Sequence, residues 1–226
     1  MAKDKEKSEG QKLQDELSFS FKHIGQIRPE DIEPSIEFCE GYKTFMNSSK
    51  TERECVRTLE AMAKKEGYKL FDPKASYKSG DRFYYVNRKK NVMLVTVGKK
   101  PLDDGIKFNI AHIDSPRLDL KPNPLYENTE IAYFKTHYYG GIRKYQWGTT
   151  PLAMHGVVVL KDGSCVDISI GENDDEPKFV VSDLLPHLSA QQNKRPLSDG
   201  LKGEELNIIV GNIPYQDDDV TEPYKL

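Results

Sequence analysis

The sequence has only three cysteines, no apolar run of bilayer length and no marked excess of charge of one sign. Cys39, Cys55 and Cys165 are widely spaced and form no Cys-x-x-Cys pair, which excludes the familiar spacings of a structural zinc site and favours reduced, partly buried thiols. The 33 basic and 36 acidic residues give a formal net charge of −3, so we expect no nucleic-acid partner. The lack of a long apolar run likewise predicts no membrane-spanning segment.

The amino terminus also lacks the features of a secretory signal. Residues 1–7 contain several charged residues, and no apolar core follows them, so we expect a cytoplasmic protein. Residues 1–20 are charged and poor in aliphatic side chains, which predicts a flexible or peripherally docked arm. We find no internal repeat.

Two helices are predicted after this arm. From Pro29, apolar side chains recur at steps of three and four residues with Glu and Lys between them, which is typical of an amphipathic helix. A second helix begins at Thr51, because Thr51 and Glu54 fit a capping box, and it ends near Gly67. The apolar positions of the first helix are Ile32, Ile36, Cys39, Tyr42, Phe45 and Met46.

Strands are predicted in the middle of the chain. Residues 81–87 and 91–97 are apolar, aromatic and β-branched, and the basic residues 88–90 between them indicate a hairpin. After a turn at 103–105, residues 107–110 alternate as a half-buried strand does. Helices followed by such strands predict an α/β layer with the second helix packed on the sheet.

The character of the chain changes after the prolines at 122 and 124. The sequence there predicts short strands, a hairpin turn at Asp162–Gly163, and one short helical piece near 182–188. We therefore expect an arm at 1–20, a first α/β region at 21–122 and a compact, mostly β domain at 123–226. The acidic run 217–219 is typical of a solvated loop. The strand-like segments are 131–136, 152–160, 165–170 and 206–210.

The residues most informative about chemistry are His112 and Asp114, which end the apolar run before Pro116. Side chains of a strand alternate, so these two should lie on one face where the strand meets its loop. An imidazole and a carboxylate so placed can provide a metal-binding nitrogen and the acid that fixes its tautomer. From these residues alone, a hydrogen-bonded pair without a metal is the alternative.

Three longer segments resemble a known family. In order and in spacing they are similar to the M18 metallo-aminopeptidases, in particular to the bacterial aminopeptidase 1 branch, relatives of aspartyl aminopeptidase. The resemblance extends from about Ile32 to the last residue. The segments are HIDSPRLDLKPNPLYE at 112–127, FKTHYYGGIRKYQW at 134–147 and PLAMHG at 151–156.

The resemblance implies a fold and an activity. The α/β region would be part of a zinc-exopeptidase α/β/α catalytic domain, followed by an inserted mostly β, barrel-like assembly domain that builds a homo-oligomer. The activity would be hydrolysis of the amino-terminal residue from a peptide substrate by a water that two divalent ions, expected to be zinc, activate.

The resemblance also assigns residues. His112 matches the first metal ligand, and Asp114 matches the catalytic-site acid that orients it. His187 matches a histidine of the inserted domain that enters a neighbouring subunit's active site and holds the substrate carbonyl. A helix-terminal histidine packed on Leu184 and Leu188 is the alternative for His187. His137 and His155 are expected to be structural, and the aromatic run around Tyr138, Tyr139 and Trp147 to form an interface.

The sequence departs from the family in one respect. The family's remaining metal ligands and its general-base glutamate are expected beyond Leu226, and the one Glu-Glu pair, Glu204-Glu205, falls in the β-rich part. We therefore expect half of a site here. The alternatives for the other half are a second chain, a remainder of the same chain, or a deletion. Two alternatives follow: a non-catalytic assembly module, or an incompletely folded piece with exposed apolar surface.

Overall fold

The computed structural model describes residues 7–19 and 21–213, so the acidic run at 217–219 lies outside the described residues. The chain divides into two units, Met1–Ser48 and Ser49–Leu226, which are described separately below. The described residues are of mixed α/β content. None of their helices combines the length and apolar character that crossing a bilayer requires.

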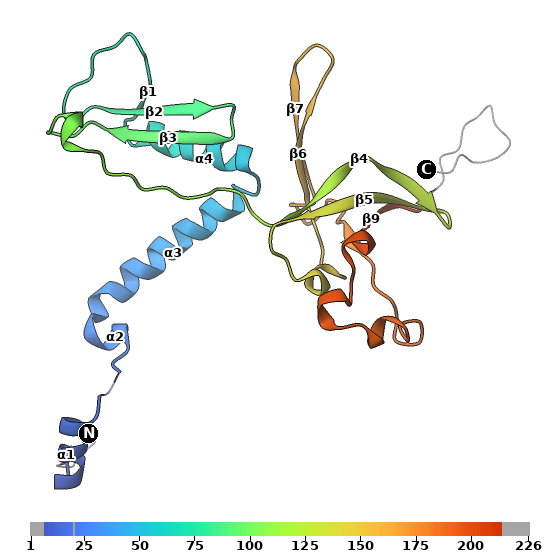
Figure 1. The fold of residues 1–226 in the computed structure, drawn as a ribbon, viewed down its shortest axis with the longest axis horizontal. Helices are drawn as coiled ribbons and strands as arrows, with labels where there is room; N and C mark the ends of the chain where they lie inside the picture. Colours follow the sequence, from blue (N-terminus) through green and yellow to red (C-terminus); the bar gives the residue numbers. More distant parts are fainter. Residues whose placement is uncertain (1–6, 20, 214–226) are drawn as a thin grey trace. The chain divides into compact units, whose positions relative to one another are not determined.

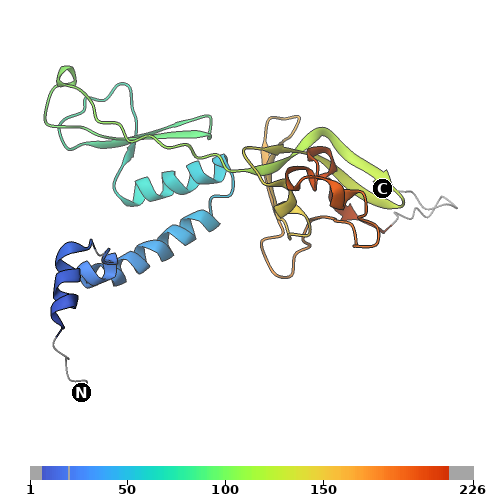
Figure 2. The same ribbon diagram turned by 60° about the horizontal axis from the view of Figure 1, so that its bottom comes forward.

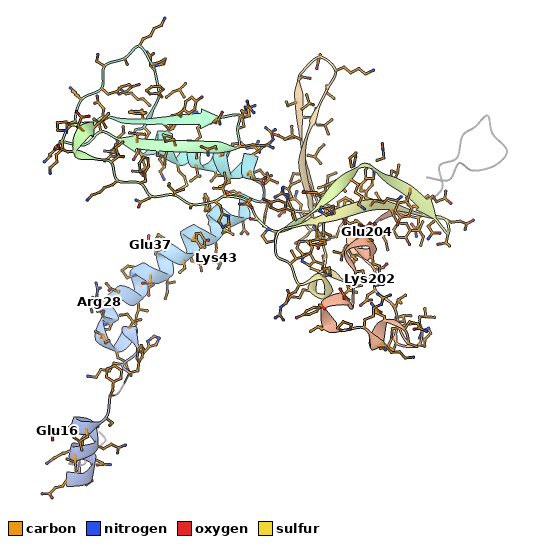
Figure 3. All side chains as sticks on the ribbon, viewed as in Figure 1. Glu16, Arg28, Glu37, Lys43, Lys202 and Glu204 are labelled. Atoms are coloured by element: carbon orange, nitrogen blue, oxygen red, sulfur yellow. The ribbon has the colours of Figure 1, made fainter. Side chains whose placement is uncertain are left out.

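The first unit contains helices only, as far as it is described. Helix α3 confirms the amphipathic helix predicted from the three- and four-residue periodicity. Helix α1 was not predicted, although Ser8 and Gln11 form a capping box that explains where it begins. In Figure 3 the labelled residues of this unit are Glu16, Arg28, Glu37 and Lys43. Its elements are α1 Glu9–Leu17, α2 Ile24–Ile27, a 3-10 turn Pro29–Asp31 and α3 Ile32–Asn47.

The second unit begins with a helix packed on a small sheet. Thr51 caps α4 as predicted, since its hydroxyl accepts from the Glu54 amide while the Glu54 carboxylate accepts from the Thr51 amide. Helix α4 lies along one face of the sheet (Figures 1 and 2), where Tyr84 is buried and donates to Glu60. The elements are α4 Glu52–Lys65, β1 Lys69–Leu70, β2 Arg82–Asn87 and β3 Asn91–Thr96.

The pairing of this sheet confirms the predicted hairpin. Strands β2 and β3 are antiparallel, and β1 lies parallel to β2 on its other side. The hairpin turn places Arg88 and Lys89 at positive φ, of 51° and 56°. The α/β layer expected from the order of helices and strands is therefore present.

The strand predicted at 107–110 is wrong. Residues 105–116 have no regular secondary structure, and Phe108 and Ile110 are 70% and 87% exposed. The alternation of apolar side chains is real. However, a strand needs a hydrogen-bonded neighbour, and the described residues provide none for this segment.

A four-stranded antiparallel sheet follows, in the order β4-β5-β9-β8. Strand β4 was not predicted, because Pro122 and Pro124 indicated a boundary. The strand accommodates both prolines at a shift of register between Leu120 and Leu125, where β4 leaves its ladder with β5. The strands are β4 Arg117–Asn128, β5 Ile131–Tyr139, β8 Val180–Val181 and β9 Ile208–Gly211.

The core of the second unit lies against this sheet. Val181, Leu201, Leu206 and Ile208 are buried there, and the partly buried Trp147 packs on them. Thr136 on β5 is buried and donates to the Leu206 carbonyl. Four 3-10 turns connect the strands around this core: Lys144–Trp147, Gln192–Lys194, Leu197–Asp199 and Gly203–Glu205.

Strands β6 Met154–Val159 and β7 Cys165–Ile170 form a separate two-stranded hairpin (Figure 1), with Gly163 at φ +84° in the predicted turn.

The helical piece predicted near 182–188 is wrong. The segment forms a single turn closed by the Leu188 amide on the Leu185 carbonyl, because Pro186 removes a donor and the neighbouring leucines find no surface to pack on.

Replacement of Leu206 by alanine should destabilise the second unit by about 2–5 kcal/mol, because the Leu206 side chain is fully buried and its loss leaves a cavity. Urea unfolding followed by circular dichroism measures this change. The matched control is Leu197→Ala, since Leu197 is 64% exposed and its loss should cost less than about 0.5 kcal/mol. Equal costs for both variants would contradict this placement of the core.

Candidate functional site

His112 and Asp114 meet on the irregular segment before β4. Nδ1 of His112 lies 2.8 Å from Oδ1 of Asp114 and 3.2 Å from its backbone carbonyl oxygen. Both partners are acceptors, so they place the proton on Nδ1. The His112 side chain is 85% exposed, and no described residue contacts its Nε2. The pair therefore forms without the strand that was expected to carry it, and it leaves one ring nitrogen accessible.

Tyr139, at the end of β5, contacts the other oxygen of the same carboxylate. Its hydroxyl donates to Oδ2 of Asp114 at 2.9 Å. The Arg117 guanidinium lies over the Tyr139 ring, 4.1 Å from the ring centroid. Sequence reasoning placed Tyr139 in an interface. The pairing of β4 with β5, which sets Arg117 opposite Tyr139, also brings Tyr139 to Asp114.

These contacts fix the protonation states at the site. The hydrogen bond from Tyr139 holds the pKa of Asp114 below its usual range, and the nearby His112 acts in the same direction. The same hydrogen bond raises the pKa of the Tyr139 hydroxyl. At neutral pH, Asp114 is therefore a carboxylate that accepts from a neutral phenol and from an imidazole N–H.

His187 lies apart from this pair in sequence and in secondary structure. It occupies the turn at 186–188, and it is exposed rather than packed at a helix end. The flanking Leu184 and Leu188 are also exposed, at 54% and 61%. The structure therefore leaves the His187 ring available for contact with another molecule.

His155 on β6 has the environment of a structural histidine. Its Nδ1 lies 2.8 Å from Oε1 of Glu54 on α4, and its Nε2 lies 2.7 Å from Oε1 of Glu172 after β7. Burial acts to lower the pKa of His155, but hydrogen bonds to Glu54 and Glu172 outweigh it and raise the pKa. Through these two contacts, His155 ties the hairpin to the amino-terminal end of α4.

The loop that presents Glu172 is held by Glu176. The Glu176 carboxylate accepts from the side-chain amide of Asn173 and from the backbone amides of residues 171–173, with distances of 2.7–3.2 Å. These donors, Asn173 foremost, lower the pKa of Glu176 to about 2. The turn after β7 is therefore held together by a carboxylate that is ionised at neutral pH.

Each carboxylate of the acidic pair Glu204-Glu205 contacts a basic side chain. Glu204, labelled in Figure 3, accepts from Lys121 on β4 at 2.6 Å, and Glu205 accepts from Arg195 at 2.8 Å.

His137 stacks on Tyr138 with ring centroids 5.5 Å apart. A hollow of about 330 Å³ lies over Ile142–Tyr145, Leu197 and Ser198, and no candidate histidine lines it.

His112 and Asp114 together fit a single metal ligand with its partner, and the described residues do not form a complete metal site. A structural or catalytic zinc ion takes three or four protein ligands. Within residues 7–19 and 21–213, no group of three or more His, Cys, Asp and Glu side chains could hold a metal ion. His112, with Nδ1 bound to Asp114 and Nε2 exposed, fits the role of a single ligand with its orienting carboxylate.

Comparisons with known proteins show the family of the chain. A family model described as aminopeptidase I zinc metalloprotease (M18) matches residues 45–222. A probable M18 family aminopeptidase 1 of Clostridium acetobutylicum is 48% identical over 188 residues, 81% of this chain. Another from Borreliella burgdorferi is 42% identical over 191 residues, 84% of this chain.

A solved structure is also similar. The crystal structure of an M18 family aminopeptidase from Thermotoga maritima superposes with a TM-score of 0.81 at 39% identity, over 89% of this chain. The chain covers 44% of that structure, and 40% and 42% of the Clostridium and Borreliella relatives. It thus spans about two fifths of the length of the relatives that it matches.

The His155 contacts predict how stability depends on pH. Because the folded-state pKa of His155 is raised, its stabilisation is fully present below the unfolded-state pKa of about 6.5 and is lost as pH rises through the folded-state value. His155→Gln should therefore cost about 1–3 kcal/mol at about pH 5.5 and less at about pH 9. Thermal unfolding across this range measures it. His137→Gln is the control and should show no such trend, whereas a cost for His155→Gln that stays constant with pH would contradict the ion pairs.

Proposed function

Because the chain belongs to the M18 family of zinc metallo-aminopeptidases, we propose that it supplies part of the active site of an enzyme that removes the amino-terminal residue from peptides. The observation that carries this proposal is the state of His112. Its Nδ1 is bound to Asp114, and its Nε2 is exposed. A neutral imidazole with a carboxylate on its other nitrogen is the usual form of a zinc-binding histidine.

In this proposal His112 is the first metal ligand, and Asp114 holds the ring and raises its basicity. When bound, the metal ions would polarise the peptide carbonyl and lower the pKa of the attacking water. The residues described here cannot hold two ions, since His112 is a single ligand. The remaining carboxylates and the general base would come from outside residues 7–19 and 21–213.

The β-rich region has an assembly role in this proposal. Residues 123–226 would be a domain inserted after the metal-ligand segment, and they would form contacts in a cytoplasmic homo-oligomer. The exposed turn that carries His187, with Leu184 and Leu188 beside it, supports contact with a second copy. There His187 would donate to the substrate carbonyl in the neighbouring active site.

A second function, that of a non-catalytic assembly module, is favoured by one observation. The described residues lack a three-ligand metal group, yet the sheet β4-β5-β9-β8 has a buried core of its own. Such a chain would associate through apolar surface without binding zinc. The two functions differ in whether His112 binds a metal ion, which the following experiments measure.

The chain by itself should bind zinc weakly and should not hydrolyse peptides. Zn²⁺ binding, measured by isothermal titration calorimetry and visible in the wild type as a shift of the His112 Nε2 resonance, should be abolished by His112→Ala and kept by His137→Ala. An aminoacyl-p-nitroanilide should stay intact, because one imidazole cannot hold two ions. Turnover by the chain alone would show that its ligands have been assigned wrongly.

A chimera tests the activity directly. In it, this chain replaces the matching two fifths of the Clostridium relative, so that the remaining ligands are present. The chimera should contain zinc and cleave an aminoacyl-p-nitroanilide. His112→Ala should lower the rate by more than about 100-fold, beyond the usual cost of losing an outer partner of a metal ligand, while His137→Ala should not. A folded, associated chimera without zinc or turnover would support the assembly module instead.

A further inference from the structure

The carboxylate of Asp114 is held from two sides. Its Oδ1 contacts His112 at 2.8 Å, and its Oδ2 accepts from the Tyr139 hydroxyl at 2.9 Å. Asp114 itself lies in the segment 105–116, which has no regular secondary structure to fix it. Of these two partners, Tyr139 is the one that belongs to a sheet. The side-chain contact from β5 is therefore what orients the carboxylate toward His112.

Tyr139 is itself held by Arg117. The two residues are directly opposite each other in the β4–β5 ladder, and the guanidinium lies 4.1 Å from the ring centroid. Arg117 cannot turn away easily, because it also donates to Asp119 at 2.7 Å and to Glu52 at 3.0 Å. These contacts link the amino-terminal end of α4, through Arg117 and the phenol ring, to Asp114.

The backbone beside this pair adds a further constraint. Gly140 follows Tyr139 with φ +82°, a conformation that favours glycine. A Cβ at Gly140 would lie 3.5 Å from Cα of Pro116, so the chain turns closely past the end of the irregular segment. The turn thus keeps the end of β5 next to the segment that carries Asp114.

The chemistry suits a phenol at this position. A cationic side chain on Oδ2 would compete with His112 for the charge of Asp114. The phenol donates a single neutral hydrogen bond and leaves the carboxylate ionised to accept from Nδ1–H. With the proton kept on Nδ1, the lone pair of the ring is on Nε2, where a metal ion binds.

We propose that Tyr139, braced by Arg117, is a positioning residue of the metal site: it orients Asp114 so that His112 keeps its proton on Nδ1 and presents Nε2 to the metal. This proposal rests on the proposed role of His112 as a ligand. Nothing in the sequence pattern assigned Tyr139 this role, because the contact spans 25 residues and depends on strand pairing.

The test compares Tyr139→Phe with Tyr138→Phe in the full chain. Tyr138 is the neighbouring residue on β5, and its ring lies against Gly203, so the control removes a hydroxyl from the same strand. At about pH 8.5, well above the usual histidine pKa of about 6.5, long-range nitrogen–proton NMR reports the tautomer of His112. Wild type and Tyr138→Phe should show Nδ1–H as the main form, and Tyr139→Phe should show a large gain of Nε2–H.

A zinc titration gives the second readout. Zn²⁺ alone, followed through the His112 Nε2 resonance, should bind about tenfold more weakly to Tyr139→Phe than to Tyr138→Phe. Backbone amide shifts of β4 and β5 check that the ladder is intact. If Tyr139→Phe disturbs the ladder, Arg117→Lys, which keeps the charge but loses the planar stacking group, should give a smaller change of the same sign.

The outcomes separate this proposal from the proposed function. An unchanged tautomer and unchanged zinc affinity in Tyr139→Phe, with zinc still lost in His112→Ala, would overturn the role of Tyr139 alone. Zinc binding, measured by isothermal titration calorimetry, that His112→Ala does not affect would overturn the ligand role of His112. In that case the tautomer measurement would still report whether Tyr139 orients Asp114.

Discussion

Arg117 and Tyr139 face each other across the β4–β5 ladder, and the candidate site depends on this cross-strand pair. The segment 105–116 carries His112 and Asp114 but makes no ladder of its own. Its position is therefore set at its end, where Arg117 begins β4 and Tyr139 reaches back to the Asp114 carboxylate. Because no regular strand carries the site, side-chain contacts orient Asp114 and His112.

Two histidines of the second unit show how surroundings determine a role. His155 lies between two carboxylates, is mostly buried and has both nitrogens occupied, so its two contacts tie α4 to the β6–β7 hairpin. His112 has one carboxylate on one nitrogen and an exposed ring. The first arrangement stabilises a fold and has no room for a ligand. The second leaves a lone pair accessible, as a metal ligand must.

The two larger sheets of the second unit differ in how far other side chains cover them. The sheet β4-β5-β9-β8 has its own core around Leu206. The sheet β1-β2-β3 has α4 on one face, while Tyr85 and Met93 are 49% and 54% exposed. The sheet β1-β2-β3 therefore keeps an exposed apolar face, of the kind on which a further layer of secondary structure can pack.

The sequence by itself determined the local elements and the key pair. Periodicity gave α3, the Thr51–Glu54 capping box gave the start of α4, and the turn residues gave both hairpins, because these depend on neighbours within a few residues. The sequence also brought His112 and Asp114 together, although through a strand that the structure does not have. Only the tertiary structure decided that 107–110 is not a strand and that β4 passes through its prolines. It also decided that Tyr139 serves Asp114, since each of these depends on which distant segment lies alongside.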